Sequence, residues 1–258
     1  MTHYLSAEMF RTVRRRYLYW TLGVCALVLL GVVSLFAYAN STIDDPSQMA
    51  HTEFLFLFFI QFLPSIGLYF TLLIGDMTFS EEHKVQTMRN TLFCGTPRIT
   101  VYLGKFINSL IFCCIMMVAL LAVAFGLSAV MLGIGPEFQE TMVSFGMMLA
   151  GCIPLWIAGA ALSVALYSNI PSTNLAAFSF IGIFVVPTNL LRLTAFMTQK
   201  EIFGQIRSLL VTSRLDELAK GAAAEDPAFL ITCWVTGMVF TAIFLIAGYI
   251  GFSRKEIK

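Results

Sequence analysis

The sequence predicts an all-α polytopic membrane protein with six transmembrane helices. Hydrophobic residues make up 58% of the 258 residues and charged residues 12%, against about 45–50% and about 25% in soluble domains. The hydrophobic residues form long uncharged runs, and a membrane-spanning helix needs about 20 such residues. Continuous runs of this kind favour helices over a β-barrel, whose strands would show short alternating segments.

The composition also excludes several classes of protein. With 16 basic and 15 acidic residues, a soluble enzyme of this size would expose large apolar patches. A nucleic-acid partner is not expected, because it requires a basic surplus and the net charge is +1. The cysteines lack metal-ligand spacing, so we expect small buried hydrophobic residues rather than disulfides or a zinc site. They are Cys25, Cys94, Cys113, Cys114, Cys152 and Cys233.

Six spans account for the hydrophobic runs. They cover residues 18–39, 54–76, 102–135, 141–167, 174–195 and 228–252. The uncharged stretch from 141 to 191 is too long for one span. The polar residues 168–174 divide it, because the residue before Pro171 is biased away from helix. Two pairs of small residues, Gly159/Ser163 and Ala247/Gly251, have the spacing that lets helices approach closely.

The placement of Lys and Arg predicts that both termini are cytoplasmic in a multi-pass plasma-membrane protein. With six spans, one side carries Arg11, Arg14, Arg15, Arg16, Lys84, Arg89, Arg98, Lys105, Arg254, Lys255 and Lys258. The opposite loops, 40–53 and 136–140, carry acidic residues and no basic ones. Residues 196–226 have balanced charges and are expected outside the cytoplasm. The N-terminal segment also resembles a signal peptide in its arginines, its first apolar run and residues 37–39. However, this apolar run is longer than the apolar region of a typical signal peptide.

Residues 1–17 have the pattern of an amphipathic helix on the cytoplasmic membrane surface. Apolar residues recur at helical spacing from Leu5 to Tyr17, and the interleaved basic residues suit anionic lipid headgroups. The membrane-facing basic residues are Arg11, Arg14, Arg15 and Arg16. The alternative is a positively charged flank that only sets the topology.

Residues 77–101 are longer than a connection between two spans requires. Ser80 is a candidate N-cap for a helix that begins with Glu81 and Glu82. Val85, Met88 and Leu92 would give this helix one apolar face. Gly95, Thr96 and Pro97 would end it. The sequence therefore predicts a short amphipathic helix, suited to docking, in the loop between the second and third spans.

This segment resembles the permeases of type-2 ATP-binding-cassette (ABC) exporters. The matching residues are Glu81, Glu82, Thr87, Leu92, Thr96, Pro97, Arg98, Gly104 and Lys105. Gln86 departs from the pattern, since the family often has Gly there. Chain length, the six spans, the surface helix before them and the long segment between the last two spans are also similar to this family.

The resemblance implies a coupling helix that contacts a separate ABC ATPase. The residues expected at this contact are Glu81, Glu82, Thr87, Arg89, Leu92, Thr96, Pro97, Arg98 and Lys105. Asn169 and Pro171 would form a second, smaller contact. ATP and Mg would be bound by the partner, because this chain lacks the glycines of a phosphate-binding loop and is not expected to be an enzyme. A second permease copy or a paralogue is implied, as are short helices at the outer leaflet within residues 196–226.

The predicted cargo is amphipathic or hydrophobic, such as a lantibiotic-type antimicrobial peptide, a lipid or a lipophilic drug. The spans are rich in Phe, Met and Leu and carry no charge at mid-membrane depth. Gln61 and Asn108 either line the path or form hydrogen bonds between helices. Export, rather than import, follows from the resemblance alone.

The sequence is also compatible with two other functions. One is an ATP-independent membrane carrier or assembly factor, although ion-coupled carriers usually need an intramembrane carboxylate. The other is an intramembrane enzyme, which would need clustered catalytic residues. His3, His51 and His83 all lie outside the predicted spans.

Overall fold

The computed structural model describes residues 2–43, 49–85 and 95–254. In these residues, six helices are long and apolar enough to cross a membrane, as the sequence predicts. They are α2 (Arg16–Ser41), α3 (Thr52–Val85), α5 (Arg98–Met131), α6 (Phe138–Asn169), α7 (Thr173–Thr198) and α11 (Ala228–Arg254). The shorter helices are α1 (Thr2–Val13), α8 (Glu201–Ser208), α9 (Val211–Ala219) and α10 (Ala222–Glu225).

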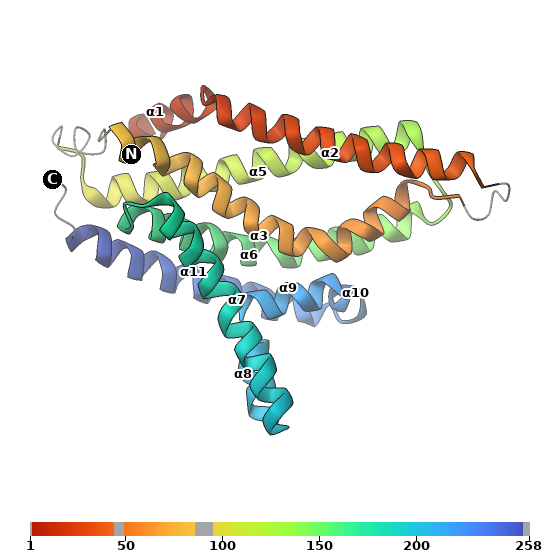
Figure 1. The fold of residues 1–258 in the computed structure, drawn as a ribbon. Coiled ribbons are helices and arrows are strands. Elements are labelled where there is room, and N and C mark those ends of the chain that lie inside the picture. Colours follow the sequence, from red (N-terminus) through yellow and green to blue (C-terminus); the bar gives the residue numbers. More distant parts are fainter. Residues whose placement is uncertain (1, 44–48, 86–94, 255–258) are drawn as a thin grey trace.

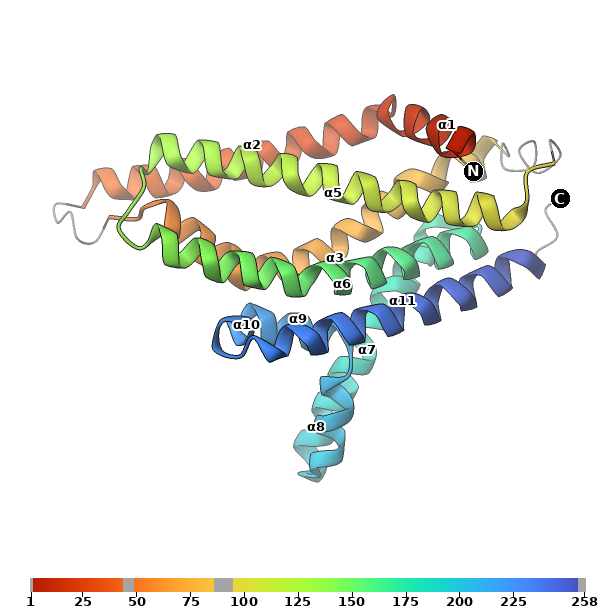
Figure 2. The ribbon, with the colours of Figure 1, turned by 180° about the vertical axis from the view of Figure 1, so that it is seen from behind.

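The long helices form an elongated bundle with two distinct ends (Figure 1). One end, called the terminal end here, holds α1, the ends of α3, α6 and α11, and the beginnings of α5 and α7. The opposite end holds the end of α2, the beginning of α3, the end of α5 and the beginning of α6. From behind, the second half of α7 and the adjoining α8 project sideways from the bundle (Figure 2). This pair is called the α7–α8 arm below.

Helix α6 is the central helix of the bundle. In its most apolar 18-residue window 72% of the residues are buried, against 6% in the corresponding window of α2. A helix that is apolar on every side but buried on only one is suited to contact with lipid. The exposed apolar side chains of α2, including Trp20 and Leu27, therefore fit a membrane environment.

Glycines bring α6 close to its neighbours α3 and α11. A Cβ at Gly159 would lie 2.7 Å from Leu68 of α3. A Cβ at Gly237 of α11 would lie 2.5 Å from backbone atoms of Pro154. Ser163 lies against Gly75, so the pair Gly159/Ser163 does face another helix, as predicted from its spacing.

The opposite end is fastened by hydrogen bonds between the beginning of α3 and the loop after α5. The backbone N–H of Gly135 donates to the Glu53 carboxylate at 2.9 Å. The Thr52 hydroxyl donates to the carbonyl of Gly133 at 2.6 Å. Gly133 has a φ of 74°, a left-handed conformation that ends helices. The third span therefore ends at Met131 rather than at residue 135.

Two further differences concern the predicted amphipathic segments. Helix α3 continues through Ser80 to Val85, so Ser80 does not begin a separate helix. The helical hydrogen bonds of the span simply extend beyond its apolar residues. The N-terminal helix ends at Val13 rather than residue 17, because Arg15 is extended and α2 begins at Arg16. Within residues 196–226 the short helices expected from the resemblance are present as α8, α9 and α10.

Candidate functional site

The first three turns of α5 contact three other helices at the terminal end. We call the residues that make these contacts the α5 junction, and they are Arg98, Gly104, Lys105, Asn108 and Ser109. Pro97 immediately precedes the helix, and its fixed φ suits a helix beginning. The junction follows directly after the loop in which the sequence places the docking element.

Arg98 joins α5 to the end of α11. Its guanidinium donates to the carbonyl of Ser253 at 2.6 Å and to that of Phe252 at 3.2 Å. The last carbonyls of a helix have no partners within the helix, and a cation there also interacts favourably with the helix dipole. The beginning of α5 and the end of α11 are therefore held together.

Lys105 joins α5 to α3. Its ammonium donates to the carbonyl of Thr78 at 3.5 Å and lies 4.8 Å from the ring centroid of Phe79. One turn further along α5, the hydroxyls of Ser109 and Thr78 are hydrogen-bonded at 3.3 Å. Polar contacts therefore join α3 and α5 on both sides of the connection between them. We call this connection the docking loop, because the sequence predicts a docking helix there.

The junction also contacts α1. The Lys105 ammonium lies 3.7 Å from the Glu8 carboxylate, and both side chains are buried. The Asn108 amide donates to the Thr12 hydroxyl at 3.0 Å. Asn108 is fully buried, and its hydrogen bond joins two helices. Gln61 is exposed on α3, and the structure does not bring the two residues together.

Apart from Arg98, which contacts the end of α11, the predicted ATPase-contact residues fall into three groups. The side chains of Glu81, Glu82, Thr87, Arg89 and Leu92 lie outside the described residues. Thr96 is half-buried and Pro97 is exposed just before α5. Lys105 differs from the prediction, because its side chain is 1% exposed and covered by α1. It therefore holds helices together inside the chain rather than lying on a surface open to a partner.

The second predicted contact, between α6 and α7, is split in the same way. The Asn169 amide donates to the carbonyl of Gly248 in α11 at 2.9 Å, so it holds two helices together. Pro171 is exposed in the turn that follows. Ser172 accepts a hydrogen bond from the backbone N–H of Leu175 and begins α7.

The arginines near the N-terminus do not share one face. Arg11 donates to Glu8 at 2.6 Å, and the Arg14 guanidinium lies 4.1 Å from the ring centroid of Phe10. Arg15 is buried, whereas Arg16 is exposed at the beginning of α2. Arg14 and Arg16 are therefore exposed, Arg11 is half-buried and Arg15 is buried.

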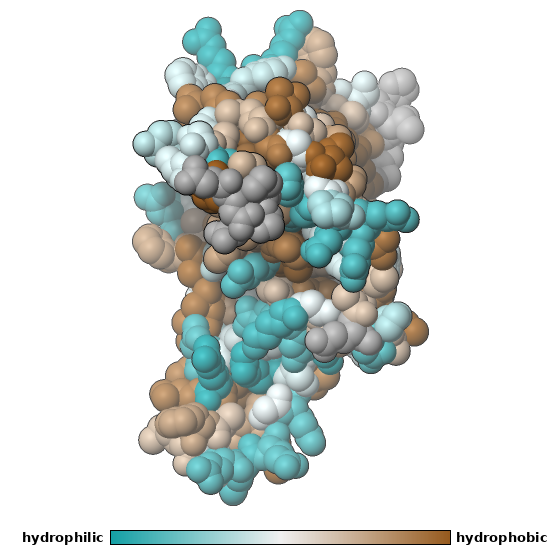
Figure 3. Space-filling model, turned by 90° about the vertical axis from the view of Figure 1, so that its right-hand side faces the viewer, coloured by the Kyte–Doolittle hydropathy of each residue, from teal (hydrophilic) through white to brown (hydrophobic). Residues whose placement is uncertain are grey.

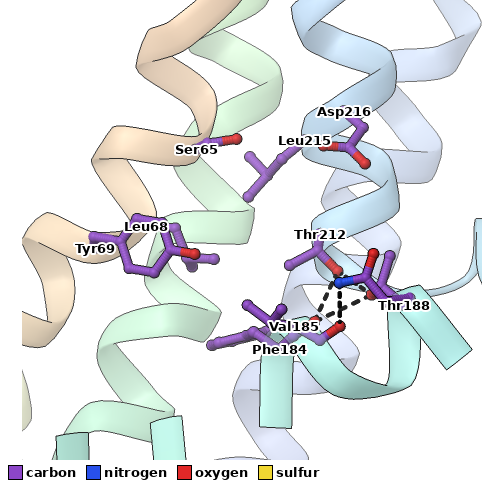
Figure 4. A pocket seen from close by; sticks show the side chains of 10 residues that line it. Ser65, Leu68, Tyr69, Phe184, Val185, Thr188, Thr212, Leu215 and Asp216 are labelled. Carbon is purple, nitrogen blue, oxygen red and sulfur yellow. Dashed lines mark hydrogen bonds between the residues drawn. The ribbon is translucent and has the colours of Figure 1, made fainter. Parts of the chain in front are cut away.

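A cavity of about 200 Å³ lies between α3, α7 and α9. Figure 4 shows Ser65 and Tyr69 on one side and Thr188, Thr212 and Asp216 on the other. The lining residues combine apolar and polar groups, and they are Ser65, Leu68, Tyr69, Phe184, Val185, Thr188, Asn189, Thr212, Leu215 and Asp216. A hydrogen bond between the Thr188 and Thr212 hydroxyls joins α7 to α9.

Sequence reasoning identified neither this cavity nor the α1 contact. The cavity joins residues more than a hundred positions apart, and their sequence neighbourhoods show no common motif. The α1 contact did leave a signal, because Tyr4, Glu8 and Thr12 recur every four residues and so share one face of a helix. That face is polar, whereas the membrane-surface prediction used the apolar residues.

Comparison with known families agrees with this architecture. Residues 4–203 match the model of the family described as ABC-2 family transporter protein. The match covers α1 and the first five membrane-spanning helices. No curated protein matches the sequence significantly. The chain belongs to the ABC-2 family of transporter proteins.

Proposed function

We propose that this chain is the membrane-spanning permease subunit of an ABC exporter that is driven by a separate ATPase. The main support for the proposal comes from the contacts that the α5 junction makes. The junction joins the helix that leaves the docking loop to α1, α3 and α11. A force applied to the loop would therefore reach four helices at once, including two membrane spans that pack on α6.

The proposed cycle has a simple mechanical basis. Binding of ATP and Mg brings two ATPase subunits together, and each carries the docking loop of its permease with it. The beginning of α5 follows the loop, and its polar contacts move α1, α3 and α11. In this proposal the terminal end is cytoplasmic, since the flanking Lys and Arg residues favour that side.

Co-purification tests whether an ATPase is the partner. The full-length permease would carry an affinity tag and be expressed in its own host, then extracted in mild detergent. We expect an ABC ATPase in amounts comparable to the permease, because both are needed for each cycle. Isolation of a permease that transports cargo without any ATPase would contradict the proposal.

We also propose that two permeases form the transport unit, as identical copies or paralogues. The α7–α8 arm supports this arrangement, because it carries strongly exposed apolar side chains, among them Phe196, Met197 and Ile202. Figure 3, viewed from the opposite end, shows hydrophilic and hydrophobic residues side by side on this projection. A second permease would cover the apolar part while the charged residues stay near water.

The proposed cargo is an amphipathic molecule, and lantibiotic-type peptides, lipids and lipophilic drugs are the classes considered. The cavity between α3, α7 and α9 supports this choice. Leu68 and Phe184 offer apolar contacts, and the Asp216 carboxylate lies 3.7 Å from the Arg207 guanidinium. A site of this kind suits a ligand with an apolar body and a polar end.

Transport by two matched variants tests the cargo site. Tyr69→Ala removes a ring that lines the cavity, whereas Tyr38→Ala removes an exposed ring from α2. With a fluorescent lantibiotic-type peptide as the probe, we expect Tyr69→Ala to raise KM about tenfold, the effect of losing part of a buried aromatic contact. Equal KM values for the two variants would exclude this cavity as the cargo site.

A further inference from the structure

Helix α1 packs on α5 through polar side chains rather than through apolar ones. Its polar side chains Glu8 and Thr12 are buried, whereas Phe10 is 61% exposed and Val13 45%. The buried residues Glu8 and Thr12 meet Lys105 and Asn108 of α5. Helix α1 is thus fixed to the bundle through polar contacts and leaves apolar residues free to meet lipid.

Gly104 and Lys105 of α5 both contact α1. A Cβ at position 104 would lie 2.7 Å from the ring of Tyr4, so only glycine lets the ring pack there without displacement. The Tyr4 hydroxyl donates to the Glu8 carboxylate at 2.7 Å. Arg11 donates to the other oxygen of the same carboxylate at 2.6 Å. Glu8 is therefore oriented from two sides toward the ammonium of Lys105.

A buried ion pair adds little net stability compared with well-packed apolar residues, but it can fix one particular register between two helices. The register of α1 on α5 matters because Lys105 lies within two turns of the beginning of α5. The Lys105 ammonium also donates to the Thr78 carbonyl of α3. One side chain therefore joins α1 to both helices that border the docking loop.

We propose that Glu8 and Lys105 are positioning residues that make α1 move together with the beginning of α5 during the transport cycle. The proposal rests on the proposed function, because the ATPase supplies the movement. Through this ion pair, movement of the docking loop reaches a helix that lies against the membrane surface. Helix α1 is then a moving part of the transporter as well as a membrane anchor.

Hydrogen exchange measured by mass spectrometry tests the proposal in two steps. The first step uses the full-length permease alone in lipid nanodiscs. We expect Glu8→Gln to speed backbone exchange of residues 2–13 about tenfold, the effect expected from weakening a buried charged contact. The exchange of α6 should not change. The exchange of the whole chain would rise if Glu8 only contributed to overall stability. Unchanged exchange in residues 2–13, or an equal rise throughout the chain, would overturn the proposal.

The second step uses the permease with its ATPase, with and without ATP and vanadate. In the wild type we expect the nucleotide to change exchange in residues 77–101 and in residues 2–13. In Glu8→Gln the change in 77–101 should remain, while that in 2–13 should fall several-fold. The exposed control Glu140→Gln should behave like the wild type.

The outcomes separate the two proposals. If residues 77–101 respond to the nucleotide but residues 2–13 of the wild type do not, the role of Glu8 and Lys105 is overturned and the proposed function stands. An equal response of residues 2–13 in the wild type and in Glu8→Gln overturns it as well. If no ATPase binds, or residues 77–101 do not respond, the proposed function fails, and the movement assigned to α1 fails with it.

Discussion

At the scale of single residues, glycines and buried polar side chains determine how closely the helices approach. Gly237 and Gly248 of α11 lie against the backbone of α6. Backbone atoms cannot rotate away as a side chain can, so a methyl group at these positions must separate the helices. Lys105 and Asn108 act differently, because they fix the register of α1 and α5 through directed contacts.

A single methyl group at position 237 should therefore destabilise the protein. Gly237→Ala places a Cβ 2.5 Å from the Pro154 backbone, and overpacking of this kind costs about 1–3 kcal/mol. Gly146→Ala is the matched control, because nothing lies within 4 Å of its Cβ. Thermal unfolding in detergent should show a lower Tm for the first variant only. Equal values would show that α6 and α11 are not as close as described.

The sequence supported only part of this detail. It predicted close approach at Gly159 and Ser163, because small residues four apart on an apolar helix leave a groove. It did not predict the role of Lys105. A lysine near the membrane boundary usually extends toward water, and only the fold places Glu8 within reach of it.

At the scale of helices, α5 organises the terminal end. Its beginning is joined to α11 by Arg98, to α3 by Lys105 and Ser109, and to α1 by Lys105 and Asn108. The six spans themselves were predictable, since each is a long and predominantly apolar run. Their ends were harder to predict, because hydrogen bonding continues past the apolar residues in α3 and stops early in α5 at Gly133.

Removal of the Arg98 contact should loosen the end of α11. Arg98→Gln removes the charge and weakens the hydrogen bonds to the carbonyls of Phe252 and Ser253. We expect faster hydrogen exchange in the last turn of α11, by about tenfold for a charged hydrogen bond. Arg192→Gln on α7 is the control for loss of a positive charge. Equal exchange in the two variants would contradict the assigned contact.

At the scale of the whole molecule, the chain is a six-span bundle of the ABC-2 family, and α3 and α5 border the two regions to which we assign docking and cargo binding. The proposed docking loop connects these two helices at the terminal end, and α3 also lines the cavity that it shares with α7 and α9. The sequence predicted the architecture from hydropathy. It could not predict the sideways course of the α7–α8 arm, because long-range packing rather than composition sets the direction of a helix.

The orientation of the bundle is a separate prediction. An epitope inserted between Pro136 and Glu137 should be reached by antibody on intact cells, because that loop carries acidic residues and no basic ones. Green fluorescent protein fused to the C-terminus should fluoresce, as it does only in the cytoplasm. An inaccessible epitope together with a non-fluorescent fusion would show that the orientation is inverted.

In the proposed cycle, ATP hydrolysis by a partner is coupled to transport through the docking loop. The most direct measurement compares ATP hydrolysis and transport of a fluorescent lantibiotic-type peptide in vesicles that contain the permease and its ATPase. The charge-reversed variant Glu81→Lys/Glu82→Lys should fold and insert normally, hydrolyse ATP and transport little peptide. Glu137→Lys/Glu140→Lys, at the opposite end, should transport like the wild type. Unchanged transport per ATP in the Glu81/Glu82 variant would show that coupling does not pass through the docking loop.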